Sequence, residues 1–300
     1  MGCTLAGTSG FNNSLRKTLN NQQIWIVGCA FNFAVLPSST AAIFRFLDGT
    51  TTQNEINVNA AGNMVWTRNG TVLATGTVVL SAGVFYYIEC MTTIAASITA
   101  GSCVLHVNGI ADITLAATTN TQNTANAYAQ TVEILTFAGV NTAIDDVYIC
   151  DGTGTANNSI LGDVRVEAIL PNAAGAFSAW TPLSGTNFSQ VDQTSEDGDT
   201  TYVSSATAGN EDTYLFGSMV SSPLNIFGIQ TTVVNRMDDA GPHTIKSIIR
   251  IAAVDYPGAT VGQASTYAFD TEIHETNPAT AAAWTAAAVN ALEAGVSLVS

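Results

Sequence analysis

The stretch IDDVYICDGTGTANN, residues 144–158, brings together two adjacent acids, a cysteine and an Asp-Gly-Thr-Gly-Thr run. Such residues can bind phosphate, hold a metal ion or form an aspartic-protease loop. A Walker-type phosphate loop requires a lysine, and both lysines of the chain lie far from this stretch, while the dinucleotide fingerprint requires a following helix that the next residues do not favour. Aspartic proteases use Asp-Thr/Ser-Gly, whereas the order here is Asp151-Gly152-Thr153. We therefore expect neither catalysis nor phosphate binding in this stretch.

Two groups of acids are candidate metal ligands. Asp145 and Asp146 lie at the edge of a predicted strand, where they either bind Ca²⁺, which prefers several convergent oxygens, or accept hydrogen bonds from loop backbone N–H groups. The stretch 191–202 is the densest acidic patch, and it lacks the EF-hand spacing, so a solvated loop is the alternative to a Ca²⁺ or interface site. Its candidate ligands are Asp192, Asp197 and Asp199. Beyond Ca²⁺ we expect no cofactor.

No other catalytic pattern is recognisable. The three histidines, His106, His243 and His274, are far apart and form no His-x-x-x-His or His-Glu-x-x-His motif. The chain also has no Gly-x-Ser-x-Gly nucleophile elbow. We therefore expect that the protein is not an enzyme.

Aromatic side chains offer a second kind of site. Trp180, Phe188 and Trp284 lie in or near predicted loops, where exposed rings could contact a glycan or a protein partner. The alternative is that aromatic residues belong to the core, as those inside predicted strands do.

The charge of the chain excludes two classes of partner. Only 10% of the residues are charged, and the net charge is −15. The charge is uneven, because residues 1–160 hold 8 acids and 4 bases, net −4, whereas residues 161–300 hold 15 acids and 4 bases, net −11. Nucleic-acid binding requires clustered Lys and Arg, which are missing, and binding to anionic membranes is disfavoured for the same reason.

The cysteines predict no metal motif, and no targeting or membrane-spanning segment is recognisable in the sequence. The cysteines are too scattered for a zinc motif, and we expect either buried free thiols or one disulfide. The sequence lacks the positively charged segment followed by an apolar segment that would predict a signal peptide. No apolar run approaches the roughly 20 residues that a membrane helix needs.

Short strands separated by turn residues are predicted throughout the first half of the chain. Asn69-Gly70 and Asn108-Gly109 are expected at hairpin turns, because both residues of such a turn can take positive φ. This spacing favours an antiparallel sandwich or jelly roll. The predicted strands lie within residues 24–36, 42–49, 55–75 (a three-stranded meander), 84–94, 102–115, 129–137 and 143–150.

The second half predicts another β-sandwich-like domain with one short helix. We expect a strand over residues 162–171, a hairpin over 225–251 with its turn at 237–242, and a strand within 265–280. Near the end, Thr285 is expected to cap a helix over residues 286–293. We expect Gly295 to end this helix and a final strand to follow over residues 296–299. The predicted organisation is an arm over residues 1–22, a jelly-roll sandwich over 23–152, a linker over 153–162 and the second domain over 163–300.

Two sets of segments carry a resemblance to known proteins. RFLDG, INVNAAGNMVWTRNGTVLATG, FYYIE, VLHVNG and IDDVYICDGTG resemble a concanavalin A-like, laminin-G-like jelly roll. The continuation DGTGTANNSILGDVRVEAILPNAAGAFSAWTP, with DGDTTY and ETNPATAAAWTAAAVNALEAGV further on, resembles tailed-bacteriophage virion proteins that carry such a domain followed by a second β-domain. No ligand residue of these relatives maps onto a matching position here.

The resemblance implies a non-enzymatic virion structural protein, made in the host cytoplasm and displayed on the exterior of the particle. It is expected to be a capsid decoration, cement or head-fibre protein, and the alternative is a tail-associated glycan-binding adhesin for host attachment. The implied partners are other virion proteins of the capsid or tail lattice, in many copies and with a homo-oligomer as one arrangement, and a host glycan for the adhesin. In this interpretation the stretch 144–158 is the last strand of the first domain and the linker that follows it.

Overall fold

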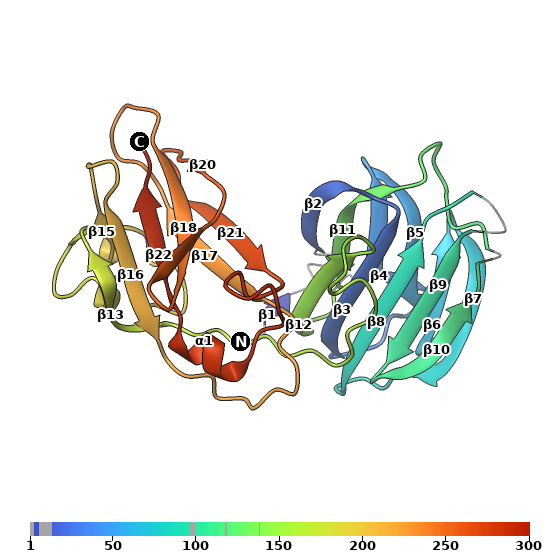
Figure 1. The fold of residues 1–300 in the computed structure, drawn as a ribbon. Coiled ribbons are helices and arrows are strands. Elements are labelled where there is room, and N and C mark those ends of the chain that lie inside the picture. The colour runs from blue at the N-terminus through green and yellow to red at the C-terminus, as the bar shows by residue number, and fades with distance from the viewer. Residues whose placement is uncertain (1–2, 6–13, 97–99, 118, 138) are drawn as a thin grey trace. The chain divides into compact units, whose positions relative to one another are not determined.

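The computed structural model describes residues 3–5, 14–96, 100–117, 119–137 and 139–300 (Figure 1). The chain divides into two compact units, Met1–Val166 and Glu167–Ser300, called here the first and the second unit. Both are built from antiparallel strands, and the single α-helix among the described residues is α1 (Ala286–Ala291). No helix in these ranges is long and apolar enough to span a membrane. The predicted all-β fold with one short helix near the C-terminus is confirmed.

The described residues of the first unit form two six-stranded antiparallel sheets, and the chain crosses between them as in a jelly roll. In spatial order the first sheet contains β1 (Cys3–Leu5), β12 (Thr142–Asp151), β3 (Ile24–Phe33), β8 (Phe85–Thr93), β9 (Ser102–Val107) and β10 (Ile110–Leu115). The second sheet contains β2 (Ser14–Gln22), β11 (Ala129–Leu135), β4 (Ala41–Asp48), β5 (Thr51–Val58), β6 (Asn63–Arg68) and β7 (Thr71–Val79).

Two Asn-Gly turns connect neighbouring strands as predicted. Asn69 and Gly70 have φ values of 46° and 75° between β6 and β7. Asn108 and Gly109 have φ values of 51° and 75° between β9 and β10. Positive φ at both central residues matches the right-handed twist of the flanking strands, which is why this dipeptide predicts a hairpin.

The core of the first unit lies between its two sheets. Alternate residues of β3 point inward, so that Trp25, Phe31 and Phe33 are almost completely buried. Phe33 stacks on Phe31 and on Phe137, with ring centroids 5.2 and 4.7 Å apart. Each fully buried ring of this kind stabilises the fold by about 1.5–3 kcal/mol. Cys29, Cys90 and Cys103 are buried free thiols, one of the two predicted states, and burial raises the pKa of Cys103 to about 12.

The first 22 residues, expected as an arm, include two strands of the sandwich. β1 pairs with β12 at the edge of the first sheet, and β2 pairs with β11 at the edge of the second sheet. The described part of this segment therefore extends both sheets by one strand.

The predicted strand over residues 162–171 is wrong. Residues 162–170 form no strand, and β13 (Pro171–Ser178) begins where the prediction ended. The physical reason is that backbone N–H groups of this segment bond to side chains of the first sheet. Gly162 N donates to Glu89, and Val166 N donates to Asp146.

The second unit is β-sandwich-like, with a larger third sheet and two smaller two-stranded sheets. Two buried clusters, around Trp284 with Ile249 and around Ile245 with Val296, form its core, and Ile229 and Val233 of β17 pack against them. The third sheet contains β13, β16 (Glu211–Phe216), β22 (Glu293–Leu298), β18 (Thr244–Ile251) and β19 (Val254–Pro257), with β20 (Val261–Gly262) also paired to β18. The two smaller sheets are β14 (Thr181–Pro182) with β15 (Val203–Ser204), and β17 (Ile229–Asn235) with β21 (Ala268–His274).

The predicted hairpin over residues 225–251 is also wrong. Both strands exist as β17 and β18, but β17 pairs with β21, and β18 pairs with β22, β19 and β20. Both edges of β18 are thus occupied by strands other than β17. Alternating hydrophobicity identifies a strand, whereas its partner depends on packing between segments far apart in the chain.

The helix near the C-terminus begins as predicted and ends earlier. Thr285 caps α1, and its hydroxyl accepts a hydrogen bond from Ala288 N at 3.2 Å. The helix ends at Ala291, however, and Gly295 lies within β22 instead of terminating the helix. A Cβ atom at Gly295 would lie 1.9 Å from the carbonyl oxygen of Asp212, so this glycine permits a close strand approach.

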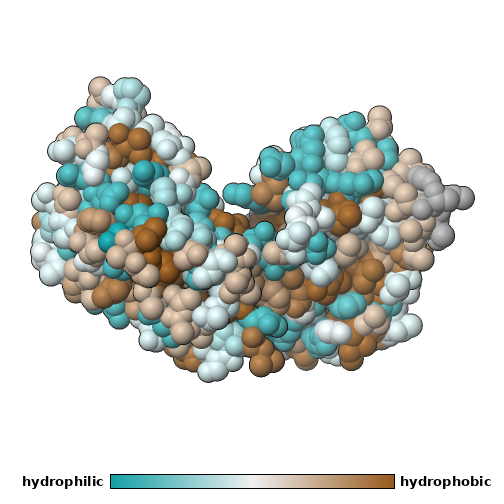
Figure 2. Space-filling model, in the orientation of Figure 1, coloured by the Kyte–Doolittle hydropathy of each residue, from teal (hydrophilic) through white to brown (hydrophobic). Residues whose placement is uncertain are grey.

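The surface reflects the low charge of the composition. Figure 2 shows extensive pale and tan areas, where residues have near-neutral or mildly apolar hydropathy, with separate hydrophilic (teal) and hydrophobic (brown) patches among them.

Candidate functional site

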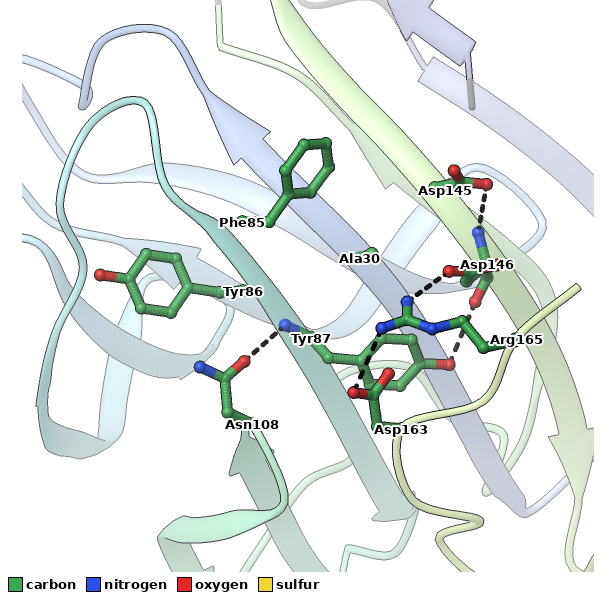
Figure 3. Close-up of a pocket in the computed structure, with 9 residues that line it drawn as sticks. All are labelled: Ala30, Phe85, Tyr86, Tyr87, Asn108, Asp145, Asp146, Asp163 and Arg165. Carbon is green, nitrogen blue, oxygen red and sulfur yellow. Dashed lines mark hydrogen bonds and ion pairs between the residues drawn. The ribbon is translucent and has the colours of Figure 1, made fainter. Parts of the chain in front are cut away.

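The first unit carries an open pocket on the outer face of its first sheet. β3, β8 and β12, the β9–β10 turn and the segment after β12 contribute side chains to it (Figure 3). Its volume is about 370 Å³. The lining residues are Ala30, Phe85, Tyr86, Tyr87, Asn108, Asp145, Asp146, Asp163 and Arg165.

A small residue forms the floor of this pocket. Ala30 in β3 pairs with Tyr87 of β8 on one side and with Asp145 of β12 on the other. Residues paired across neighbouring strands point to the same face, so the Tyr87 and Asp145 side chains rise on either side of a single methyl group. The pocket therefore exists because position 30 carries no larger side chain.

A bulge in β12 sets the orientation of the acidic side chains that line the pocket. The pairing of β12 with β3 shifts register between Asp145 and Tyr148, and Asp146 has a φ of 52°. An extra residue in left-handed conformation bends the strand and redirects its side chain. The Asp145 carboxylate accepts a hydrogen bond from Asp146 N at 2.9 Å, which stabilises this turn.

The segment 161–166, called here the strap, crosses the outer face of the first sheet. Its C-terminal end is held by Asp146, which is 9% exposed. Val166 N donates to Asp146 Oδ1 at 2.8 Å, and Arg165 donates from its guanidinium to Asp146 Oδ2 at 2.6 Å. Figure 3 shows the guanidinium between the carboxylates of Asp146 and Asp163. The strap thus places the side chains of Asp163 and Arg165 in the lining of the pocket.

The N-terminal end of the strap is held by a buried carboxylate. Glu89 in β8 is 0% exposed, and its Oε1 accepts hydrogen bonds from Gly162 N at 2.8 Å and from the Tyr148 hydroxyl at 2.7 Å. The Tyr148 hydroxyl in turn accepts from Leu161 N at 3.3 Å. Burial, and then the hydrogen bond to Glu89, raise the pKa of Tyr148. A Cβ atom at Gly28 would lie 2.1 Å from the Tyr148 ring, so this glycine makes room for the arrangement.

The rim of the pocket is aromatic and amide in character. Phe85 is 55% exposed at the start of β8. Asn108 lies in the β9–β10 turn, and its Oδ1 accepts a hydrogen bond from Tyr87 N at 2.8 Å. The Tyr87 hydroxyl donates to the carbonyl oxygen of Asp146 at 3.0 Å, which fixes the ring in the pocket.

The structure brings together two of the predicted metal ligands. Asp145 and Asp146 both line the pocket, and both oxygens of Asp146 accept hydrogen bonds from the strap. Among the residues that the structure describes, no three His, Cys, Asp or Glu side chains converge as a metal ion would require. Calcium binding at these positions stays a prediction.

The other predicted acidic ligands lie in the second unit, around the 3₁₀ helix η2 (Gly198–Thr200). Asp199 accepts hydrogen bonds from the Tyr267 hydroxyl at 2.7 Å and from the Arg236 guanidinium at 2.8 Å. The first of these, and then the second, lower the pKa of Asp199. Asp197 accepts from Thr201 at 2.8 Å, and Asp192 accepts from the Gln193 amide at 3.2 Å.

The predicted aromatic contact residues do not form one exposed face. Trp284 is 4% exposed, packs in the core of the second unit and donates from its indole to the carbonyl oxygen of His274 at 2.8 Å, so its predicted role in external contact is wrong. Trp180 is half-buried, and its indole donates to Asn210 O at 3.2 Å. Phe188 is half-buried in the 3₁₀ helix η1 (Phe188–Gln190).

Sequence reasoning missed the residues that shape the pocket. Phe85 lies in an apolar run that predicts a core strand, and Asp163 and Arg165 lie in a segment interpreted as a strand. The only signal was the alternation of β8, which places Phe85 on the same face as Tyr87.

A buried acid in the second unit gives a pH-dependent prediction. Asp212 is 0% exposed and accepts hydrogen bonds from the Tyr214 hydroxyl at 2.6 Å and the Asn187 amide at 2.8 Å. Burial raises the pKa of Asp212 above its unfolded value, so the protonated form favours folding. Its contribution to stability is complete below the unfolded pKa of about 3.9 and is lost as pH rises through the folded pKa.

We expect Asp212→Asn to become more stable relative to the parent protein as pH rises from 4 to 7. The measurement is the free energy of unfolding of both proteins in urea at several pH values, with Asp192→Asn as an exposed control. A difference between parent and Asp212→Asn that does not change with pH would contradict the prediction.

No protein-family model matches the chain, and no curated protein matches it. Solved structures match part of it. A heptameric SAP-like pentraxin from Limulus polyphemus is 14% identical with a TM-score of 0.35, over 49% of this chain and 74% of that chain. The cellulose induced protein Cip1 is 15% identical with a TM-score of 0.35, over 48% and 71%. The Caenorhabditis elegans galectin LEC-6 is 10% identical with a TM-score of 0.31, over 49% and 96%. At these identities and TM-scores the likeness carries no argument about ligand or activity.

The sheet order and the crossovers of the first unit themselves define its class. It is a jelly-roll sandwich of two six-stranded antiparallel sheets, the concanavalin A-like arrangement that the sequence predicts.

The expectation that the protein is not an enzyme is contradicted. Structures matching the chain include the alginate lyase AlgAT5, at 10% identity and a TM-score of 0.32 over 46% of this chain and 62% of that chain. They also include a Trypanosoma rangeli sialidase, at 11% identity and a TM-score of 0.31 over 42% of this chain and 20% of that chain. Enzymes are therefore among the matching structures, and a fold by itself does not justify excluding catalysis. Missing linear motifs did not justify it either, because strands distant in sequence can assemble a catalytic site.

Proposed function

We propose that the first unit binds carbohydrate in the pocket between the strap and the β9–β10 turn. The observation that carries this proposal is an exposed aromatic ring, Phe85, beside amide, carboxylate and guanidinium groups in one open cavity. A sugar presents apolar C–H faces together with many hydroxyls. An aromatic surface covers the former, and convergent polar groups bond to the latter.

The size and construction of the pocket support the proposal. Its volume of about 370 Å³ lies in the range of small-ligand pockets. The Tyr87 ring and the Asp146 carboxylate are held by hydrogen bonds within the protein, so the site is formed before a ligand arrives. A preformed site loses less conformational entropy on binding.

Filling the floor of the pocket tests the proposal. We expect Ala30→Leu to weaken binding of the glycan recognised on a glycan array by at least about tenfold, which corresponds to roughly 1.4 kcal/mol. The control is Ala60→Leu, an exposed alanine in the loop between β5 and β6. Affinity is measured by isothermal titration calorimetry, and circular dichroism confirms that each variant folds. Unchanged affinity in Ala30→Leu, or no glycan bound by the parent protein, would reject the pocket.

We further propose that the protein acts on the exterior of a bacteriophage particle, as a glycan-binding adhesin or as a decoration protein of the virion lattice. The support is the sequence resemblance to tailed-phage virion proteins. Residues 161–300 carry a net charge of −11, which favours docking of this part of the chain onto a basic surface of another virion protein.

Copy number separates these two roles. Quantitative mass spectrometry of purified particles compares the abundance of this protein with that of the major capsid protein. Near-equal abundance favours a decoration protein, and a few copies favour a tail adhesin. Absence from the particles would reject the virion setting and leave the glycan-binding proposal to its own test.

A further inference from the structure

Negatively charged groups outnumber positively charged groups in the pocket. Its lining contains three carboxylates, from Asp145, Asp146 and Asp163, and one guanidinium, from Arg165, which leave a formal net charge of −2. The chain as a whole, pocket included, carries a net charge of −15. An anionic ligand would therefore approach against both the local and the overall potential.

The single cation of the pocket is already paired. Arg165 NH1 lies 2.6 Å from Asp146 Oδ2, and its NH2 lies 3.6 Å from Asp163 Oδ2. The hydrogen bond to Asp146 raises the pKa of Arg165. A ligand carboxylate would have to take this guanidinium from Asp146, which is nearly buried and would lose its partner.

Asp163 carries the most exposed of the three pocket carboxylates. The Asp163 side chain is 51% exposed on the strap, and its ion pair with Arg165 is longer than a hydrogen bond. Phe85, 55% exposed, lies across the same pocket, and its ring face can contact either an apolar sugar face or a cation. Together they offer an acceptor and a π-surface to a positively charged group.

We infer that the pocket prefers a sugar bearing an ammonium group, a hexosamine with a free amine, over the same sugar in acetylated form and over a uronic acid. This inference rests on the proposed function, because it names the ligand class of the same pocket. The ammonium group pairs with Asp163, and the sugar ring lies against Phe85. A carboxylate on the sugar is repelled by the pocket acids.

The direct test compares three oligosaccharides of equal length. The probes are hexamers of β-1,4-linked glucosamine, of N-acetylglucosamine and of galacturonic acid, titrated into the full chain by isothermal titration calorimetry at pH 6. We expect the glucosamine hexamer to bind roughly fivefold tighter than the N-acetylglucosamine hexamer, as one exposed ion pair allows. Its advantage should shrink as salt is raised. Binding of the galacturonic acid hexamer should be the weakest of the three.

A charge-neutral variant separates the local pairing from the overall charge. Asp163→Asn should remove most of the preference for glucosamine, because it should lower the affinity for the glucosamine hexamer more than the affinity for the N-acetylglucosamine hexamer. Asp192→Asn removes the same charge from an exposed position in the second unit and should keep the preference. Equal loss in both variants would show a non-specific attraction and overturn the inference.

The outcomes also distinguish this inference from the proposed function. If the N-acetylglucosamine hexamer binds and is blocked by Ala30→Leu but glucosamine has no advantage, the inference fails and the glycan site stands. Tightest binding of the galacturonic acid hexamer likewise overturns the inference alone. If none of the three hexamers binds, the inference fails, and the proposed function is decided separately by the glycan array.

Discussion

Gly295→Ala is expected to destabilise the third sheet of the second unit strongly while leaving the stability of the jelly roll of the first unit unchanged. Gly295 lies in β22, the central strand of that sheet, where it pairs with Thr213 and Ile248. A Cβ atom there would lie 1.9 Å from the carbonyl oxygen of Asp212, and a backbone atom cannot move away without displacing β16. Overpacking of this kind costs roughly 3 kcal/mol, a large part of the stability of a small unit.

Hydrogen-exchange mass spectrometry of the full chain measures this effect unit by unit. Peptides from β16, β18 and β22 should lose protection in Gly295→Ala, and peptides from β3 and β8 should keep it. The matched control is Gly262→Ala in β20, because a Cβ atom at that position meets nothing within 4 Å. Retained protection of β22 in Gly295→Ala would show that the sheet adjusts and would refute the prediction.

Removing the Glu89 carboxylate is expected to release the strap from the first sheet. Glu89→Ala leaves Gly162 N and the Tyr148 hydroxyl without their buried acceptor. An unpaired donor shielded from water costs about 1–3 kcal/mol, so for these two half-buried donors together we expect a loss of roughly 3 kcal/mol in unfolding free energy. Since the strap carries Asp163 and Arg165, ligand affinity should fall as well.

A conservative variant makes the interpretation specific. Glu89→Gln keeps an oxygen that can accept both hydrogen bonds, so it should retain most of the stability that Glu89→Ala loses. Exchange protection of residues 161–166 reports the strap directly, and the urea midpoint reports the unit. The hypothesis fails if Glu89→Ala and the parent protein protect the strap equally, or if the Gln variant is as damaging as the Ala variant.

The sequence predicted the strands of the first unit well from β3 onward, because each of these shows its pattern locally, whereas β1 and β2 lie in the segment expected as an arm. Asn69-Gly70 and Asn108-Gly109 marked hairpin turns through their tolerance of positive φ, and both turns formed. Thr285 marked the start of α1 through its side-chain cap. These signals involve residues close together in the chain, so the amino-acid types alone are sufficient.

Pairings between distant segments were not predictable in the same way. The run 225–251 contains two strands, but β17 bonds to β21 and β18 bonds to β22. Gly295 was interpreted as a helix terminator, whereas its function is to admit the neighbouring backbone at a strand crossing. In both cases the local pattern was compatible with several partners, and packing selected one of them.

The pocket shows most clearly which features the sequence determines and which depend on the tertiary structure. Composition and spacing alone determined an all-β, acidic chain with few charges, and they singled out Asp145 and Asp146. Only the tertiary structure placed Asp163, Arg165 and Phe85 beside them, because a bulge in β12 and the buried Glu89 together direct the strap across the sheet. Backbone propensities act over a few residues, whereas a binding site depends on contacts between segments that are distant in the chain and meet only after the sheet has formed.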